Sequence, residues 1–294
     1  MKGLREILED ADARRVAVGH FNIAELAALN GIFAAARELN FPVIIGVSEG
    51  ERAFIGVRRA AALVRSLREE FDYPIFLNAD HTHSLDKVRE AAEAGFDEIL
   101  FDGSALPREE NIKQTAEAAR IAREAGRGIG KDIVVEGEIG YIGADSEVIA
   151  EKPDLVLSTP EEAVEFVKAT GVDVLAPAVG NMHGLLKSMV SGTARKRLDI
   201  PRIAEIKAAI GAAGCRFMTS HGGSGTEDAD FTAAAKAGMT IIHVSSELRL
   251  AWRRGVEEGL KEKPEEIAPY KILPPAAEGI RKIVLDRLRL FNAA

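Results

Sequence analysis

The sequence predicts an α/β fold, a (β/α)8 TIM barrel with a helical extension at its C-terminus. Two observations lead to this prediction: eight short apolar segments alternate with helical stretches, and polar side chains gather where each apolar segment stops. One barrel of about 250 residues and a tail account for the 294 residues without a second core. We therefore expect a single domain over residues 1–294, with residues from about 260 to 294 packed on the barrel or on a partner subunit.

A repeat along the chain supports the alternation of helices and strands. In each copy a helical stretch ends in glycine, and a short apolar run follows at once. Glycine after a helix supplies the left-handed C-cap, and a continuous apolar run indicates a strand buried on both faces, as in parallel sheets covered by helices. The clearest copies are "AAEAGFDEILFDGS", "VKATGVDVLAPAVGN", "AAIGAAGCRFMTSHGGS" and "AAKAGMTIIHVSS".

Eight parallel strands indicate a closed barrel. Between them, "LAALNGIFAAAREL" and "LDKVREAAEAG" show the apolar spacing of three and four that is typical of helices. An open doubly wound sheet is the alternative, but "VGHFNIAEL" at the first strand has a single Gly in place of a dinucleotide fingerprint. The tail "PYKILPPAAEGIRKIVLDRLRLF" predicts a Pro-broken loop and a final amphipathic helix. The expected strands are residues 16–21, 43–47, 75–79, 98–101, 133–138, 174–178, 216–220 and 240–244.

Composition limits the partners and the compartment. The chain has 38 Lys and Arg against 46 Asp and Glu, a net charge of −8, which gives no basic surface for nucleic acid or anionic lipid. The single cysteine, Cys215, excludes a disulfide framework within the chain and suits a reducing cytoplasm. Neither a signal peptide nor a membrane span of roughly 20 apolar residues is found in the sequence. We expect a cytoplasmic protein with a small-molecule partner.

Polar residues follow the expected strands, and all six histidines lie near a strand end. In a (β/α)8 barrel the active site lies at the C-terminal ends of the strands. One His there is more often structural than a ligand, but random placement would leave several on helix faces. Neutral imidazoles from different strands suit Zn²⁺, which takes three protein ligands and keeps a fourth position open when it is catalytic. These polar residues are His20, Asn22, Ser48, Glu49, Asp80, His81, Asp102, Ser104, Glu136, Glu138, Asn181, His183, His221, His243, Ser245 and Ser246.

A glycine-rich turn, "SHGGSG", follows the seventh expected strand. Consecutive glycines let backbone N–H groups approach an anion, and barrels often bind phosphate after strands seven and eight. Ser245 and Ser246 stand after the eighth strand and add hydroxyl groups. The pattern predicts a phosphorylated substrate.

Short motifs stand in order along almost the whole chain, from about Val16 to the last helix: "FNI" with "PVIIGVSEG", "ADH", "DGSALPREENI", "VEGEIG", "VGNMHG", "HGGSG" and "SSELRLAW". In order and spacing this set resembles the class II zinc-dependent ketose-bisphosphate aldolases, which act on fructose or tagatose bisphosphates. Each motif is short, but the ordered set is specific. The resemblance implies a homodimer or homotetramer.

The resemblance implies a metal centre. His81, His183 and His221 match the ligands of the catalytic zinc ion. Asp102 and Glu138 match positions that offer a second, alternative divalent site.

The resemblance also implies substrate-binding residues. A phosphate clamp for the dihydroxyacetone phosphate half is expected, where a monovalent cation, Na⁺ or K⁺, often assists. Asn22 and Ser48 match polar positions on the substrate side. The clamp positions are Gly184, Gly222, Gly223, Ser224, Ser245 and Ser246.

The implied reaction is the reversible cleavage of a ketose phosphate, by default fructose 1,6-bisphosphate, to dihydroxyacetone phosphate and an aldehyde, as in glycolysis and gluconeogenesis. Cleavage between C3 and C4 leaves an enediolate, whose charge Zn²⁺ stabilises as a Lewis acid. Asp80 matches the catalytic Asp that takes the C4 hydroxyl proton and returns it in condensation.

A second carboxylate, from the loop after the fifth strand, handles the proton on the enediolate carbon in the family. Here the loop reads "YIGADSEVIAEKPD". Asp145 and Glu147 are the candidates, although an ungapped alignment puts Ser146 at the family position.

Two further positions differ from the family. His243 stands where Asn is usual and is expected to touch the enediolate or substrate hydroxyl groups. Ala277 stands where an Arg often binds the distal phosphate, and Ala cannot bind it. The distal group is then unphosphorylated or is bound by Arg253, Arg254 or Lys271. Tagatose 1,6-bisphosphate and ketoses without a distal phosphate are therefore alternative substrates.

Two functions outside aldol cleavage are alternatives. "HTH" gives the H-x-H pair His81 and His83, with which amidohydrolase-like metallohydrolases bind a metal. That pair normally follows the first strand, whereas two βα units precede it here. The other alternative is a non-catalytic metal- or sugar-phosphate-binding protein, which would bind zinc and ligand without cleavage.

Overall fold

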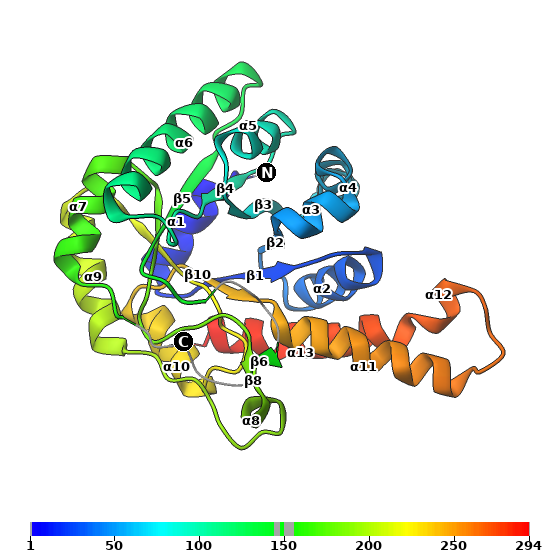
Figure 1. Cartoon of the computed structure of the whole chain (residues 1–294). Helices are drawn as coiled ribbons and strands as arrows, with labels where there is room; N and C mark the ends of the chain where they lie inside the picture. The colour runs from blue at the N-terminus through cyan, green and yellow to red at the C-terminus, as the bar shows by residue number, and fades with distance from the viewer. Residues whose placement is uncertain (1, 144–147, 150–155, 294) are drawn as a thin grey trace.

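The computed structural model of the chain describes residues 2–143, 148–149 and 156–293. Its strands form a closed parallel barrel in the order β1-β10-β9-β7-β5-β4-β3-β2 (Figure 1). The predicted fold class is confirmed. Each barrel strand overlaps its expected range with bounds that differ by at most two residues, except that β3 continues three residues further, to Thr82. The barrel strands are β1 (Val18–Asn22), β2 (Val43–Val47), β3 (Ile75–Thr82), β4 (Glu98–Phe101), β5 (Val134–Ile139), β7 (Val174–Pro177), β9 (Phe217–Ser220) and β10 (Ile241–Val244).

Helices surround the barrel (Figure 1). A separate pair of short parallel strands, β6 (Val148–Ile149) and β8 (Leu185–Leu186), joins the segments that follow β5 and β7. The helices are α1 (Leu4–Arg14), α2 (Leu26–Leu39), α3 (Glu49–Ile55), α4 (Val57–Phe71), α5 (Leu85–Glu93), α6 (Arg108–Gly128), α7 (Pro160–Thr170), α8 (Lys187–Val190), α9 (Ile200–Ala212), α10 (Asp228–Ala237), α11 (Ser246–Glu262), α12 (Pro269–Ile272) and α13 (Pro274–Phe291).

The boundaries of α7 show how local sequence sets a helix between two strands. Thr159 accepts a hydrogen bond from the Glu162 backbone, and the Glu162 side chain bonds back to Thr159, which forms a capping box. Pro160 occupies the first turn, where a missing N–H costs nothing. Gly171 ends the helix at φ 67°, a left-handed conformation that glycine adopts without strain. The chain is then free to enter β7.

Helix α1 closes the N-terminal end of the barrel. Leu4 and Leu8 are buried in one cluster with residues near the beginnings of the strands, such as Val18, Ile44 and Phe76. Burying such side chains removes apolar surface from water at about 25 cal/mol per Å². Because α1 covers this end, the opposite end, where the strands stop, is the one that can admit a ligand.

The C-terminal helices pack closely on the barrel. Helix α13 contacts α2, α11 and β1, and α11 and α13 lie side by side in Figure 1. Glycines permit the close crossing, because a Cβ at Gly31 would lie 2.5 Å from the Ala277 carbonyl oxygen. A Cβ at Gly255 would likewise lie 2.3 Å from the Ala276 Cα. The tail thus fixes the outer side of β1, which carries two of the site residues.

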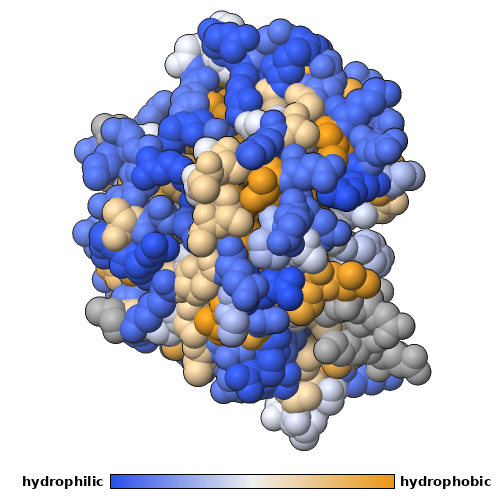
Figure 2. All heavy atoms as spheres, turned by 90° about the vertical axis from the view of Figure 1, so that its left-hand side faces the viewer, coloured by the Kyte–Doolittle hydropathy of each residue, from blue (hydrophilic) through white to orange (hydrophobic). Residues whose placement is uncertain are grey.

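The outer helices present a polar surface. Figure 2 shows the side of the molecule that carries α7 and α9, where hydrophilic residues predominate and apolar ones form narrow patches. The described residues contain no helix with both the length and the apolar character that crossing a membrane requires.

Candidate active site

The end of β3 directs two neighbouring side chains into one cluster. In a regular strand Asp80 and His81 would point to opposite faces. His81 instead has a left-handed backbone, φ 40°, and the register against β4 shifts between Ala79 and Thr82. A bulge of this kind re-aims a side chain at some cost in backbone strain. As a result His81 Nε2 lies 3.7 Å from Asp80 Oδ1.

The three histidines predicted to bind zinc meet at this end of the barrel. One ring nitrogen each of His81, His183 and His221 lies within 4.8 Å of the others. His81 Nδ1 is 2.7 Å from Asp102 Oδ2, and His221 Nε2 is 2.6 Å from Glu136 Oε1. A carboxylate on one ring nitrogen fixes the orientation of the imidazole and leaves the other nitrogen for a metal. His183 Nε2 is buried and has no hydrogen-bond partner among the described residues.

Burial keeps two of these imidazoles neutral. It lowers the pKa of His183 well below the usual value and also lowers the pKa of His221. Burial opposes the charge on His81 as well, but the carboxylates of Asp80 and Asp102 outweigh it and raise the pKa of His81 to about 10. Since imidazole binds a metal in its neutral form, metal binding has to displace a proton from His81.

The residues predicted for a second divalent site also meet. Ligand atoms of His81, Asp102 and Glu138 lie within 4.8 Å of one another. Glu138 Oε2 is 3.8 Å from His81 Nδ1 and lacks a hydrogen-bond partner in the part of the chain that the structure describes. Burial and the nearby Asp102 charge raise the pKa of Glu138 to about 8. The two metal positions would therefore share His81.

Asp80 lies between the histidines and Asn22. Its Oδ2 accepts a hydrogen bond from Asn22 Nδ2 at 2.8 Å. Its Oδ1, unpartnered within the described ranges, is 3.6 Å from His243 Nδ1. Burial alone would raise the pKa of Asp80, but the charge of His81 and the contact with His243 hold it well below its usual range. Asp80 is thus an ionised carboxylate with one oxygen in position to accept a proton.

His243 stacks on His20 deeper in the barrel. The ring centroids are 3.5 Å apart and the planes differ by 7°. Glycine at position 46 makes room for this stack, because a Cβ there would lie 2.1 Å from the His20 ring. Burial lowers the pKa of His20 to about 4 and that of His243 well below the usual value. His243 is therefore a neutral imidazole beside Asp80.

The glycines predicted to bind phosphate lie where two loops touch. Gly184 and Gly222 have φ of 72° and 61°, and a Cβ at Gly222 would lie 2.1 Å from the Met182 carbonyl oxygen. A Cβ at Gly223 would lie 2.6 Å from the His243 carbonyl oxygen. Glycine is needed at positions 222 and 223 for the segments after β7 and β9 to pack together and against the end of β10.

The predicted serines join this loop to the start of α11. Ser224 Oγ accepts hydrogen bonds from the backbone N–H groups of Ser245 at 3.3 Å and Glu247 at 3.1 Å. Ser246, the first residue of α11, is buried. The N-terminus of a helix carries a partial positive charge that favours an anion. Ser224, Ser245 and Ser246 therefore lie together at this helix end.

Ser48 and His83 belong to none of the potential metal-binding groups of the described residues. Ser48 caps α3 and accepts a hydrogen bond from the Glu51 backbone. The exposed ring of His83 has its centroid 6.5 Å from that of His81. Asp145 and Glu147, the candidates for the second proton carrier, lie outside the described residues.

The sequence interpretation missed a hydrogen-bonded network beside Asp80. Glu51 Oε2 accepts from Asn22 Nδ2 at 3.0 Å and from the Ser48 backbone at 2.8 Å. Its Oε1 lies 2.7 Å from Arg249 Nη2. Glu51 and Arg249 lie near the starts of α3 and α11, and nothing in the sequence around them indicates that they hold Asn22 and Asp80 in place. Glu136, the partner of His221, could have been found from the sequence. It lies two residues before the predicted ligand Glu138 on β5, so the two side chains point to the same face of the strand.

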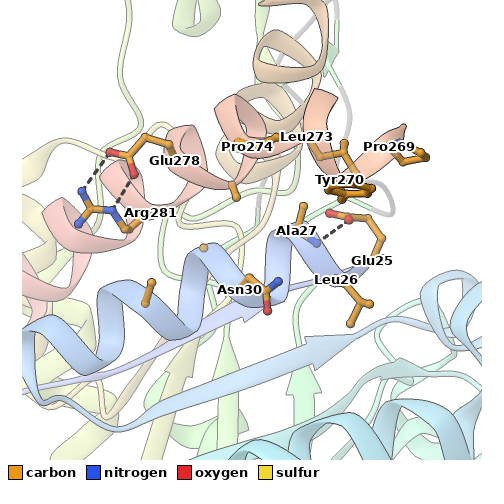
Figure 3. A pocket seen from close by; sticks show the side chains of 13 residues that line it. Glu25, Leu26, Ala27, Asn30, Pro269, Tyr270, Leu273, Pro274, Glu278 and Arg281 are labelled. Atoms are coloured by element: carbon orange, nitrogen blue, oxygen red, sulfur yellow. Dashed lines mark hydrogen bonds and ion pairs between the residues drawn. The ribbon is translucent and has the colours of Figure 1, made fainter. Parts of the chain in front are cut away.

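Two cavities flank α2. One of about 530 Å³ is lined by Asn22, Glu51, Trp252 and Arg253 among others, so it adjoins the residue that holds Asp80. The other, of about 760 Å³, lies between α2 and the α12–α13 segment, whose side chains face each other in Figure 3. Ala277 lines this second cavity. Among the described residues, no predicted metal ligand or catalytic residue lines this larger cavity. The smaller cavity, which Asn22 lines, therefore lies nearer to the histidine cluster.

Comparisons with known proteins agree with this geometry. A family model described as "Fructose-bisphosphate aldolase class-II" matches residues 2–294. The chain is 34% identical to the probable fructose-bisphosphate aldolase of Bacillus subtilis, over 99% of this chain and 97% of that protein. It is 32% identical to the fructose-bisphosphate aldolase of Geobacillus stearothermophilus, over 99% and 96%.

A solved structure is similar as well. The YdjI aldolase from Escherichia coli K12 matches with a TM-score of 0.80 and 26% identity, covering 99% of this chain and 97% of that one. The family match spans the barrel, the histidine cluster and the C-terminal helices. The chain therefore belongs to the class II fructose-bisphosphate aldolase family and is a carbon–carbon lyase.

Proposed function

We propose that this aldolase is zinc-dependent and reversibly cleaves a ketose bisphosphate, by default fructose 1,6-bisphosphate, to dihydroxyacetone phosphate and an aldehyde. The observation that carries the proposal is the three-histidine group, His81, His183 and His221, with ligand atoms within 4.8 Å of one another. The curated relatives are named fructose-bisphosphate aldolases.

The donor set fits zinc. Three imidazoles converge, which matches the ligand number of catalytic zinc sites. His183 Nε2 is buried and, within the described residues, has no other partner. When bound, zinc would supply a Lewis acid for the C2 carbonyl and for the negative charge that cleavage between C3 and C4 leaves. Asp102 and Glu138 would offer a second divalent position together with His81.

Asp80 would move the proton of the C4 hydroxyl group. Its Oδ2 is engaged by Asn22 at 2.8 Å, so Oδ1 is the oxygen that would take the proton during cleavage and return it during condensation. In the metal-free protein the charge of His81 outweighs the effect of burial and keeps the pKa of Asp80 low. Bound zinc would supply positive charge in place of the His81 proton. His243 Nδ1, 3.6 Å from Oδ1, would contact the same substrate hydroxyl groups.

The dihydroxyacetone phosphate half would bind at the clamp. Gly184, Gly222, Gly223 and Ser224 would present backbone groups to the phosphate, and Ser245 and Ser246 would add the N-terminus of α11. Asp145 or Glu147 would carry the proton at the enediolate carbon. Ser48 would contact the substrate side, and the chain would act as a homodimer or homotetramer.

The distal end of the substrate would enter the cavity of about 530 Å³ beside Asn22. Its two arginines have carboxylate partners, Glu51 at 2.7 Å from Arg249 and Glu257 at 2.8 Å from Arg253. Paired guanidinium groups hold phosphate less strongly than unpaired ones. This observation supports a second candidate within the same reaction, a ketose without a distal phosphate, beside tagatose 1,6-bisphosphate.

A substrate panel tests the proposal. Aldehyde release would be measured from fructose 1,6-bisphosphate, fructose 1-phosphate and tagatose 1,6-bisphosphate, with and without a chelator. We expect cleavage of at least one substrate, its loss on chelation and its return with added Zn²⁺. Activity that survives complete zinc removal would contradict the metal-dependent mechanism, and zinc and ligand binding without cleavage would favour a non-catalytic binding protein.

A further inference from the structure

Lys196 is a buried lysine whose ammonium group binds three backbone carbonyls. The residue is 3% exposed, and Nζ donates to the carbonyl oxygens of Met182 at 2.7 Å, Gly184 at 2.7 Å and Gly222 at 2.9 Å. These carbonyls belong to the segments after β7 and β9. Lys196 therefore joins two parts of the predicted phosphate clamp, the segment around Gly184 and the segment around Gly222.

The geometry identifies the protonation state. An ammonium group has three N–H donors, and the three carbonyls use all of them. A neutral amine would leave one carbonyl facing a lone pair. Burial lowers the pKa of Lys196 to about 7, and the charge of Glu247 opposes this effect. A phosphate bound nearby would act in the same direction as Glu247 and favour the charged form. The site thus holds a desolvated cation beside the place where an anion is expected.

The backbone of the same residue is fixed to the glycine-rich loop. Lys196 N–H donates to the Gly225 carbonyl at 2.8 Å, and its own carbonyl accepts from the Glu227 N–H at 3.0 Å. A parallel β-bridge pairs Lys196 with Thr226. Because backbone and side chain are both held, the ammonium group has a defined position relative to Gly222.

A free monovalent cation does not fit at these carbonyls. Proteins bind K⁺ by letting carbonyl oxygens replace its hydration shell, and that is the arrangement that surrounds Lys196 Nζ. The resemblance to the family led us to expect Na⁺ or K⁺ at the phosphate clamp. Here a covalently attached cation occupies the carbonyls of Gly184 and Gly222.

We propose that Lys196 is the built-in cation of the phosphate clamp, so that this aldolase binds its phosphorylated substrate and turns over without a monovalent cation. The ammonium group takes the place of the ion by holding Gly184 and Gly222 together and by adding positive charge near the phosphate. This inference rests on the proposed function, because it assumes that the clamp binds the phosphate of dihydroxyacetone phosphate.

The first test uses the wild-type protein loaded with zinc. Ketose cleavage and dihydroxyacetone phosphate binding by calorimetry would be measured in tetramethylammonium chloride, KCl, NaCl and NH4Cl at equal ionic strength. We expect the same kcat, KM and affinity in all four salts. An increase of about tenfold or more on adding K⁺, the size of one lost charged hydrogen bond, would overturn the inference.

Two substitutions separate a missing cation from a damaged fold. Lys196→Ala opens the carbonyl site, and Lys196→Met fills it with an uncharged chain of similar length. We expect both to raise KM for the ketose phosphate about tenfold or more. K⁺ or NH4⁺ should restore Lys196→Ala in a saturable way but leave Lys196→Met impaired. Unchanged activity in Lys196→Ala without K⁺, or a loss that none of the cations restores, would overturn the inference.

Lys207 provides a matched control. It is a partly buried lysine, 2.6 Å from Asp12 Oδ1 and bonded to the Arg216 carbonyl, which precedes β9 at the other end of the barrel. Lys207→Ala should lower the thermal stability without creating any cation dependence. If the wild type neither binds dihydroxyacetone phosphate nor cleaves a ketose phosphate in any salt, the proposed function fails. Binding that requires K⁺ refutes only the role of Lys196.

Discussion

The side-chain nitrogen of Asn22 lies 2.8 Å from Asp80 Oδ2 and 3.0 Å from Glu51 Oε2, so one NH2 group bridges two buried carboxylates. Because both neighbours only accept hydrogen bonds when ionised, the group between them has to be the amide nitrogen, and the orientation of Asn22 follows. Arg249, 2.7 Å from Glu51 Oε1, balances the second charge. The position of the proposed base thus depends on residues outside the metal centre.

A double-mutant cycle tests this dependence. Glu51→Ala should lower kcat about tenfold, because Asn22 loses one of its two anchors and Asp80 shifts. In the Asn22→Ala background the same substitution should cost nothing further, since Glu51 acts through Asn22. Steady-state cleavage kinetics measure both effects, and equal losses in the two backgrounds would contradict the coupling. Asp97→Asn is the control. Asp97 is a buried carboxylate just before β4 that lies 2.6 Å from Arg68 Nη2, so its substitution should lower the stability without changing kcat.

Removing the charge of Asp80 should separate chemistry from metal binding. Asp80→Asn keeps the size of the side chain but removes the base, and we expect kcat to fall about 10²- to 10⁴-fold, the usual contribution of general acid–base catalysis. The zinc content, measured by elemental analysis, should stay at the wild-type level. Asp86→Asn, an exposed carboxylate in the first turn of α5, is the matched control. Cleavage at the wild-type rate by Asp80→Asn would show that another group is the base.

The sequence was sufficient for the barrel and for the convergence of the histidines. Apolar runs such as Val43–Val47 are typical of strands in a covered parallel sheet, and parallel strands place their C-terminal ends together. All six histidines could therefore be placed at one end of the barrel without coordinates, whereas the choice of His81, His183 and His221 as ligands came from the resemblance to the family. His83 could be separated from them only by analogy, because the bulge that turns His81 inward has no sequence signature.

Contacts through side chains and loops could not be predicted in this way. The amphipathic pattern of α1 does not say that Leu8 closes the end of the barrel, since any apolar surface would satisfy it. Lys196 lies in "ARKRL", a basic run that normally indicates a solvated surface. Glu51 likewise belongs to the capping box at the start of α3, and this local role gives no reason to expect its contacts with Asn22 and Arg249. In each case the tertiary partner, and not the local pattern, determines the role.

The two histidines of "HTH" should respond oppositely to substitution. His183→Ala and His81→Ala remove ligands of the proposed zinc site, and both should lose bound zinc and cleavage activity. His83→Ala should retain both, because its exposed ring lies away from the cluster. Metal analysis after dialysis, with cleavage assays on the same samples, provides the measurement. Zinc that is lost from His83→Ala but kept by His183→Ala would restore the hydrolase alternative.

Zinc affinity should depend on pH through His81. The Asp80 and Asp102 carboxylates outweigh burial and raise its pKa to about 10, so the metal-free protein carries a proton there at neutral pH. The other two ligands are neutral, because burial lowers the pKa of His183 and of His221. Each zinc ion should therefore displace one proton, and affinity should rise about tenfold per pH unit between pH 7 and pH 9. Competition with a calibrated chelator at each pH measures this slope, with His83→Ala as the control that should keep it. An affinity that stays flat over this range would mean that His81 is already neutral or is not a ligand.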